Sequence, residues 1–182
     1  MQSRTRPVSF DARAAGRGLA LRPVNGGDAA FLTELFASVR AADFAPLGWP
    51  EPVLRQLLAQ QAQFQHLQYE TAYPEAERLI VERDSVPVGR IYVDEGEAAI
   101  RLIDISLTPD ERGKGSGTAL VRDLLDRAAA AGKPVILSVV QGNPARRLYE
   151  RLDFDACADG GAYEEMRWAP PGAFPCRDPG AP

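Results

Sequence analysis

Three glycines at alternate positions, Gly113, Gly115 and Gly117, form the stretch of the sequence best suited to chemistry. A loop almost free of side chains can bring successive backbone N–H groups close to an anion, because no Cβ stands in the way. An apolar strand over 100–107 precedes this loop, and an amphipathic helix that ends at Gly132 follows it. Strand, glycine-rich turn and helix N-terminus together predict a phosphate-binding site.

The spacing of these residues narrows the kind of phosphate site. Lys114 is followed by glycine rather than serine or threonine, which excludes a P-loop. A dinucleotide fingerprint needs a third glycine where Thr118 or Leu120 stands. The pattern that fits is Arg-x-x-Gly-x-Gly over Arg112 to Gly117, which resembles the coenzyme-binding motif of the GCN5-related N-acetyltransferase (GNAT) family. For this hexapeptide alone, a glycine-rich turn before an ordinary helix is the alternative.

A second motif of the same family follows at the expected distance. The strand over 135–140 leads into Asn143, then into Leu-Tyr with the tyrosine at Tyr149, and then into x-x-Leu-x-Phe. Asp153 stands where the family usually has glycine, so the turn after this segment is expected to differ locally. The resemblance extends from about Leu19 to Trp168. It implies an α/β fold with a mixed, mostly antiparallel central sheet flanked by helices, in which parallel strands splay apart at the acetyl-CoA site.

Apolar periodicity predicts the other elements. Three strands in close succession form an antiparallel meander, and the apolar strand over 135–140 is expected to lie parallel to the strand before the glycine loop. Helices are predicted from Asp28, which is expected to cap the first, and from Glu51 to about Thr71. The expected strands are 19–23, 78–83, 88–94, 100–107, 135–140 and 163–168. The expected inner faces of the two helices are Phe31, Leu32, Leu35, Phe36 and Val39, and Leu54, Leu57, Leu58 and Phe64.

Length and composition bound the class of protein. The 182 residues suit one domain at 18–168, between a disordered extension at 1–17 and a disordered Pro/Gly-rich tail at 169–182. A net charge of −4 argues against nucleic-acid binding, and no apolar run reaches the length of a membrane span. Cys157 and Cys176 are too few for a disulfide framework, which favours a cytoplasmic location. His66 has no second ligand at a metal-binding spacing, so no metal is expected.

The resemblance implies that acetyl-CoA is the cosubstrate and that the main chain holds it. Backbone groups of Ile105, Ser106 and Leu107 are expected to pair with the pantetheine arm and to polarise the acetyl oxygen. Asn143 either bonds the same arm or only caps the helix that follows it. The expected diphosphate donors are the backbone N–H groups of Arg112, Gly113, Lys114, Gly115, Ser116, Gly117 and Thr118.

Two side chains are the catalytic candidates. Tyr149 matches the family tyrosine that protonates the departing thiolate, although it can equally pack over the cofactor. Asp104 is the candidate base or amine-orienting group, because Arg101 stands where some family members carry a glutamate. An amine that arrives neutral needs no base. The glutamines of the second helix face either the acceptor or solvent: Gln56, Gln60, Gln61, Gln63, Gln65 and Gln68.

The function that these residues favour is acetyl-CoA-dependent N-acetyl transfer, made directly to a primary amine of a small molecule or a peptide. No cysteine stands beside the loop to form an acyl-enzyme. The alternatives are an acyl-CoA-binding or sensor module on the same scaffold, and a purely structural globule. The sequence leaves the acceptor open, and a homodimer is a further expectation from the family.

Overall fold

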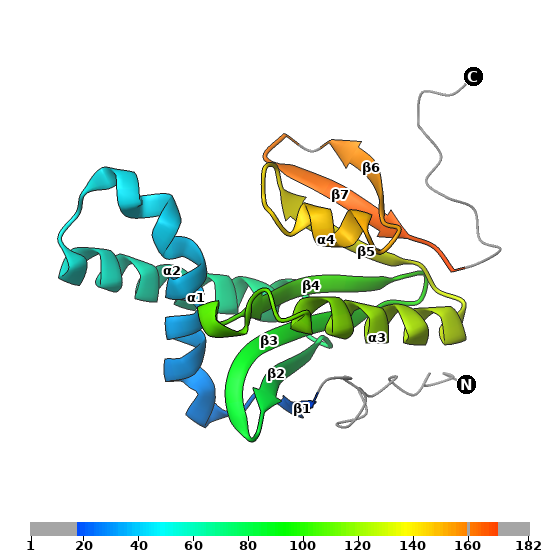
Figure 1. Cartoon of the computed structure of the whole chain (residues 1–182), viewed down its shortest axis with the longest axis horizontal. Coiled ribbons are helices and arrows are strands. Elements are labelled where there is room, and N and C mark those ends of the chain that lie inside the picture. The colour runs from blue at the N-terminus through cyan, green and yellow to red at the C-terminus, as the bar shows by residue number, and fades with distance from the viewer. Residues whose placement is uncertain (1–17, 160, 171–182) are drawn as a thin grey trace.

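The computed structural model describes residues 18–159 and 161–170, and the predicted extension at 1–17 and most of the predicted tail lie outside them. Seven strands and four α-helices follow one another along this part of the chain (Figure 1). They are β1 (Leu19–Pro23), α1 (Ala29–Phe44), α2 (Glu51–Ala72), β2 (Glu77–Arg83), β3 (Val86–Glu95), β4 (Ile100–Leu107), α3 (Ser116–Ala131), β5 (Val135–Val140), α4 (Arg146–Glu150), β6 (Asp155–Asp159) and β7 (Tyr163–Trp168).

The strands form one sheet in the order β1-β2-β3-β4-β5-β7-β6. Every neighbouring pair is antiparallel except β4 and β5, which are parallel, so the predicted meander and parallel pair are both confirmed. Asp84 and Ser85 join β2 to β3 with φ values of 51° and 64°. Positive φ at both central residues is the geometry of a two-residue type I′ hairpin turn, whose twist matches that of the strands it joins.

Helix α3 covers one face of the sheet, where it buries the apolar side that its periodicity predicts (Figure 1). Leu120 and Leu124 pack among Ile91 of β3 and Leu102 of β4, and none of these side chains is more than 4% exposed. Full burial of such a side chain stabilises the fold by about 1.5–3 kcal/mol. Gly132 ends the helix in the left-handed conformation, with φ of 67°.

Helices α1 and α2 pack against each other, and α1 also contacts β3 and β4. Leu35, Phe36 and Leu58 are buried as predicted, but Val39 is 41% exposed and Phe64 is 71% exposed. The prediction for these two side chains is therefore wrong. Phe64 directly precedes Gln65, which is bonded to the sheet, and one position turns a side chain about 100° around a helix.

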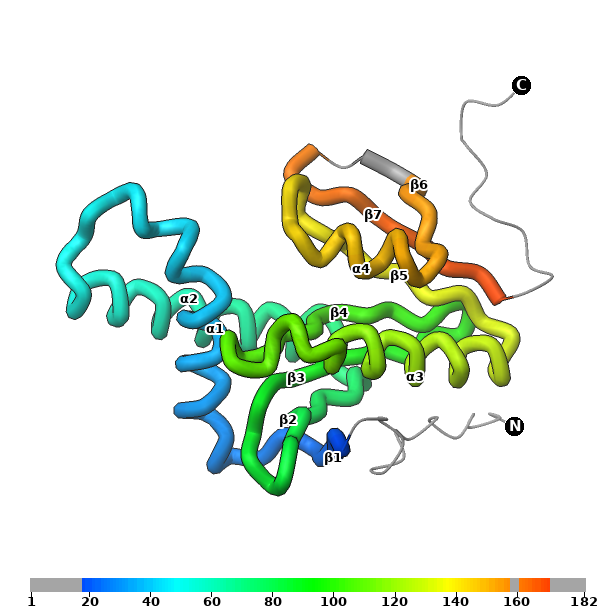
Figure 2. The backbone as a smooth tube through the Cα atoms, viewed as in Figure 1, coloured from blue at the N-terminus to red at the C-terminus, as the bar shows by residue number. Residues whose placement is uncertain are grey.

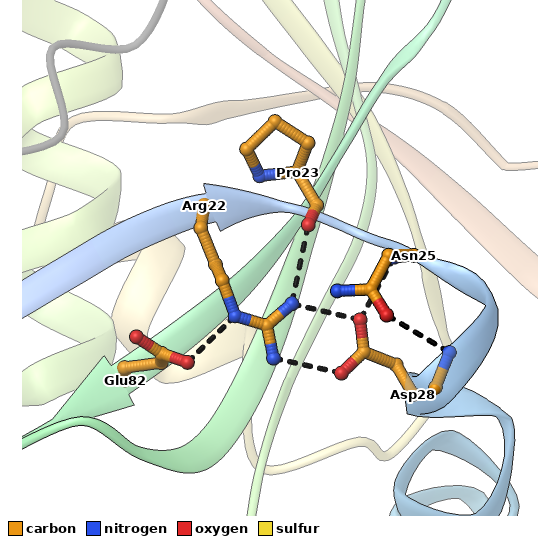
Figure 3. Close-up of polar contacts among 6 residues, drawn as sticks. Arg22, Pro23, Asn25, Asp28 and Glu82 are labelled. Atoms are coloured by element: carbon orange, nitrogen blue, oxygen red, sulfur yellow. Dashed lines mark hydrogen bonds and ion pairs between the residues drawn. The ribbon is translucent and has the colours of Figure 1, made fainter.

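Polar residues fix the start of α1 (Figure 3). The Asn25 side chain accepts a hydrogen bond from the Gly27 N–H (2.8 Å), and the Asp28 carboxylate accepts one from the Asn25 N–H (2.8 Å). Arg22 donates to Asp28 (2.7 and 2.8 Å) and to Glu82 of β2 (2.6 Å). Asp28 makes no side-chain capping bond to α1. The predicted cap is therefore wrong, because the carboxylate is used by Arg22 and by the short turn before the helix.

The chain reaches its last two strands through a tight turn at Asp153. This residue has φ of 61°, a left-handed conformation that aspartate tolerates better than most residues. The aspartate therefore occupies a glycine-like conformation at the position where the sequence departs from the family pattern. Strand β6 follows and pairs with the predicted β7; β6 itself was not among the predicted strands.

Candidate active site

Strands β4 and β5 pair over only three residues each. The parallel register joins Ile100–Leu102 to Val135–Leu137, and the described residues show no ladder pair between the two strands beyond it. From there β4 stays with β3, whereas β5 stays with β7. The backbone trace shows β1–β4 and β5–β7 diverging from this short pairing, with the start of α3 on the side where they separate (Figure 2).

A bulge in β4 sets which side chains face the opening. Tyr92 of β3 pairs with Asp104 and Val93 pairs with Leu102, so Ile103 is an extra residue without a partner in this register. Ile105 and Leu107 pack partly buried against the core beneath α3. The side chains that alternate with them, Asp104 and Ser106, therefore face the opposite side of the sheet.

The glycine loop between β4 and α3 has the backbone that its sequence predicts. Gly113 and Gly115 adopt φ of 74° and 82°. The Ala119 N–H donates to the Gly115 carbonyl (3.0 Å), so the N–H groups of Ser116 and Gly117 come before the first turn is closed. The helix dipole and these amides make this end of α3 attractive to an anion.

The two cationic side chains of the loop already have partners in the described part of the chain. The Arg112 Nε donates to the Leu107 carbonyl (2.9 Å), and its guanidinium also lies 3.4 Å from Ser38 of α1. Lys114 Nζ lies 3.6 Å from a carboxylate oxygen of Glu111, and its side chain is 56% exposed. Lys114 is thus the more accessible positive charge beside the loop.

Glu111 lies beneath the loop and is only 2% exposed. Its carboxylate pairs with Arg83 of β2 (2.6 Å) and accepts a short hydrogen bond from the Ser116 hydroxyl. Arg83 also donates to the Ser116 hydroxyl (3.3 Å). The hydrogen bond from Arg83 is the main cause that lowers the pKa of Glu111 to about 2, against the opposing effect of burial. Glu111 is therefore ionised at neutral pH.

A second buried polar cluster surrounds Asp104, on the sheet face away from α3. Arg90 of β3 donates to both carboxylate oxygens of Asp104 (3.1 and 2.9 Å), and the two side chains are 8% and 11% exposed. The Ser106 hydroxyl donates to Asp104 (2.8 Å), and the Tyr69 hydroxyl of α2 lies 3.4 Å from it. Asp104 is thus a fully engaged ion-pair partner.

Three residues that sequence reasoning missed, Arg90, Tyr92 and Tyr69, complete this cluster together with Gln65, one of the glutamines expected to face the acceptor or solvent. Gln65 of α2 accepts a hydrogen bond from Arg90 (2.6 Å), and the Arg90 guanidinium lies over the Tyr92 ring, 5.1 Å from its centroid. Tyr69 contacts Tyr92 edge-on at 6.2 Å. Burial is the main cause that raises the pKa of both phenols, so both are protonated at neutral pH. The signal that could have indicated the cluster is a polar pair at alternate positions within the apolar part of β3, Arg90 and Tyr92.

Tyr149 is 7% exposed and packs edge-on against Phe154, with ring centroids 5.6 Å apart. Within the described residues its hydroxyl has no hydrogen-bond partner. Burial raises the pKa of Tyr149 above that of an ordinary phenol, and the charge of Asp104 raises it further. The phenol is therefore protonated over the whole range in which the protein would work.

Asn143 and Arg101 are held by local contacts. The Asn143 side chain accepts a hydrogen bond from the Ala145 N–H (2.9 Å), which is a capping contact before α4. Arg101 lies 3.6 Å from Glu165 of β7. Among residues 18–159 and 161–170, no group of His, Cys, Asp and Glu is arranged to hold a metal ion. No helix in this part of the chain is long and apolar enough to cross a membrane.

A family match identifies which kind of phosphate-binding fold this is. The model of the acetyltransferase (GNAT) family matches residues 41–154, which include the splayed strands, the glycine loop and Tyr149. This chain belongs to the GNAT family. No curated protein matches it. The family match confirms the resemblance that the two sequence motifs predict.

Solved structures agree with the GNAT fold. The PaiA N-acetyltransferase from Thermoplasma acidophilum, in complex with coenzyme A, is 17% identical with a TM-score of 0.64, over 83% of this chain and 98% of that one. An acetyltransferase from Thermus thermophilus is 24% identical with a TM-score of 0.58, over 83% and 96%. FdhC, a nucleotide-linked sugar GNAT, is 15% identical with a TM-score of 0.61, over 89% and 91%.

Proposed function

We propose that this GNAT protein is an acetyl-CoA-dependent N-acetyltransferase that transfers acetyl directly to a primary amine of a small molecule or a peptide. The observation that carries the proposal is the glycine loop at the N-terminus of α3, on the side of the sheet where β4 and β5 diverge (Figure 2). An unpaired strand edge can hydrogen-bond the amides of an extended ligand, and the helix end beside it can bind an anion. A ligand suited to both has a chain that carries amides and a diphosphate at one end. Coenzyme A has this form, and the PaiA structure contains it.

The residues present fit such a cosubstrate. Left-handed Gly113 and Gly115 supply a loop without Cβ atoms, and the amides from Arg112 to Thr118 would hold the diphosphate. Lys114 would add charge. Backbone groups of 105–107 would hold the pantetheine arm and polarise the thioester carbonyl, as the family resemblance implies. Asn143 contributes less to this proposal, since its side chain is used in capping.

The chemistry is a direct displacement at the thioester. The amine nitrogen bonds to the acetyl carbon while the carbon–sulfur bond breaks, and the amine loses one proton while the leaving thiolate gains one. Tyr149 is the proposed donor to the thiolate. Burial keeps its hydroxyl protonated, and the absence of a hydrogen-bond partner in the described residues leaves the proton available.

Asp104 is proposed as a positioning group rather than as the base. Arg90, Ser106 and Tyr69 occupy its oxygens, so a proton taken from the amine would have to weaken an ion pair that is almost completely buried. The acceptor amine is therefore proposed to be deprotonated through solvent. The Arg90–Asp104 cluster would instead fix the wall against which the acceptor lies.

The cellular location of the protein and the identity of its amine acceptor remain predictions. A cytoplasmic protein that meets amine acceptors, without nucleic acid or membrane partners, is the expectation from composition, and a homodimer is the expectation from the family. The alternative, a sensor module, would also bind the coenzyme but would not turn over a substrate. Tyr149 in its buried, protonated state favours the enzyme.

Calorimetry with acetyl-CoA, followed by thiol release and mass detection over an amine panel, tests the proposal. Binding with turnover of at least one amine is expected, whereas binding without turnover would favour the sensor module. A folded protein that gives no binding would refute both.

The variant Tyr149→Phe tests the acid role. Removal of the hydroxyl should lower kcat by about 10²–10⁴-fold, because general acid catalysis contributes that much. Acetyl-CoA affinity and thermal stability should stay close to those of the wild type, since the ring is retained and the hydroxyl makes no hydrogen bond within the described residues. Wild-type turnover in this variant would assign Tyr149 a packing role only.

A further inference from the structure

The buried carboxylate of Glu111 holds the glycine loop from beneath. It contacts Lys114 within the loop (3.6 Å), Ser116 at its end and Arg83 on β2 (2.6 Å). Ser116 is itself only 1% exposed, so its hydroxyl is turned inward. We call Glu111, Arg83 and Ser116 the Glu111 brace.

Charge alone does not explain a carboxylate at this place. A negative group beneath a loop that is suited to anions opposes anion binding by its field. Arg83 offsets that charge. Two apolar residues in place of this pair would leave the site equally neutral, without the cost of burying an ion pair. What the ion pair adds is geometry, because Arg83 bonds both Glu111 and the Ser116 hydroxyl. The brace therefore ties the first residue of α3 to β2 through three side chains.

We propose that Glu111 is a positioning residue for the coenzyme diphosphate, holding Ser116 inward so that the loop is already ordered when the coenzyme binds. The inference rests on the proposed use of acetyl-CoA. The backbone of a loop that is not ordered in advance has to be ordered on binding, and that cost lowers affinity. The brace removes this cost by fixing residues on both sides of Gly115.

The variant Glu111→Ala distinguishes an effect of charge from an effect of positioning, because the two would change the affinity for acetyl-CoA in opposite directions. Removal of the carboxylate makes the charge beneath the loop more positive, so an effect of charge alone would tighten acetyl-CoA binding. Loss of the brace should instead weaken binding by roughly tenfold or more. Calorimetry with acetyl-CoA should show the higher Kd. Kinetics should show a higher KM for acetyl-CoA, with kcat at saturation and the acceptor KM unchanged.

The matched control is Asp28→Ala. Asp28 is also a buried carboxylate that pairs with an arginine at the start of a helix, but it lies at α1 (Figure 3). The Asp28→Ala variant should have a lower thermal stability than the wild type and an unchanged Kd for acetyl-CoA. An equal rise in Kd for both variants would mean that general destabilisation weakens binding, and would overturn the proposal.

Ser116→Ala is the second variant, for use if Glu111→Ala does not fold. It removes the hydroxyl from the brace without changing any charge, and its Kd for acetyl-CoA should rise by a smaller factor of about threefold to tenfold. Unchanged or tighter binding in the folded variants would overturn the positioning role while leaving the proposed function standing. A wild-type protein that does not bind acetyl-CoA would overturn both.

Discussion

Gly89 of β3 lies against the part of β4 that the proposed cosubstrate would contact. A Cβ added at Gly89 would lie 2.5 Å from the Ser106 carbonyl oxygen, 2.6 Å from a Leu107 methyl carbon and 3.3 Å from the Leu107 Cα. The first contact is with backbone, so it cannot be relieved by a side-chain rotation. In Gly89→Ala, the β4 backbone would have to recede by about 0.9 Å to reach the ordinary contact distance of 3.4 Å.

Two effects of Gly89→Ala follow from that displacement. Overpacking typically costs about 1–3 kcal/mol, which for a chain of this length lowers Tm by roughly 2–12 °C. A displacement of about 1 Å in a positioning element can also lower the rate by about 10²-fold. We therefore expect a lower Tm by calorimetry, together with a lower kcat/KM for acetyl-CoA.

The control for this prediction is Gly26→Ala. Gly26 has no atom within 4 Å of the position that a Cβ would take, and its backbone is not left-handed, so Tm and activity should stay at wild-type values. Wild-type Tm and kcat/KM in Gly89→Ala would show that β4 yields without cost. The close approach of β3 to β4 would then have no role in shaping the site.

Three further predictions concern other parts of the molecule. Asp104→Asn leaves the buried Arg90 without its counter-charge, which should lower stability by about 3–5 kcal/mol and raise the acceptor KM; the pH–rate profile should keep its shape, and loss of its acidic limb would instead identify Asp104 as the base. Asp153→Gly should raise the free energy of unfolding in urea by about 0.5–1 kcal/mol, because glycine has no steric penalty at this positive φ; a decrease would show that the aspartate side chain stabilises the turn. Because the pKa of Glu111 is lowered to about 2 from 4.5, its stabilising contribution is complete above pH 4.5 and is lost as the pH falls toward 2. The Tm difference between wild type and Glu111→Gln should therefore shrink below pH 4.5, and a constant difference would contradict the ion pair.

Local pattern predicted the elements that carry the site. Helix α3, its glycine loop and the parallel strand β5 each follow from periodicity and spacing within fewer than twenty residues, and Tyr149 from a motif of similar length. The expectation for Phe64 failed because its position on the apolar side of α2 was inferred from the helix alone. Whether that side meets the sheet is decided by the contacts of Gln65 and Tyr69 with β3 and β4.

The two polar clusters could not be predicted from local pattern. Arg83 and Glu111 are 28 residues apart in sequence, and Gln65 and Arg90 are 25 apart, so neither pair has a periodic signal. Each is created when strands and helices pack. The demand for glycine at Gly89 has the same origin, since it depends on how closely β4 approaches.

The bulge at Ile103 gives β4 one residue more than the facing stretch of β3 can pair with. Substitution of Ile103 would leave the pairing with β3 in place, whereas an in-frame loss of one codon here would remove the extra residue. Asp104 would then follow Leu102 directly, opposite Tyr92 and Val93, so the ladder would become regular. Asp104 would stay on the polar face of the sheet and Ile105 on the apolar face. Loss of Ile103 is therefore expected to straighten β4 and to reduce its local twist, while the side chains of the polar cluster keep their side of the sheet.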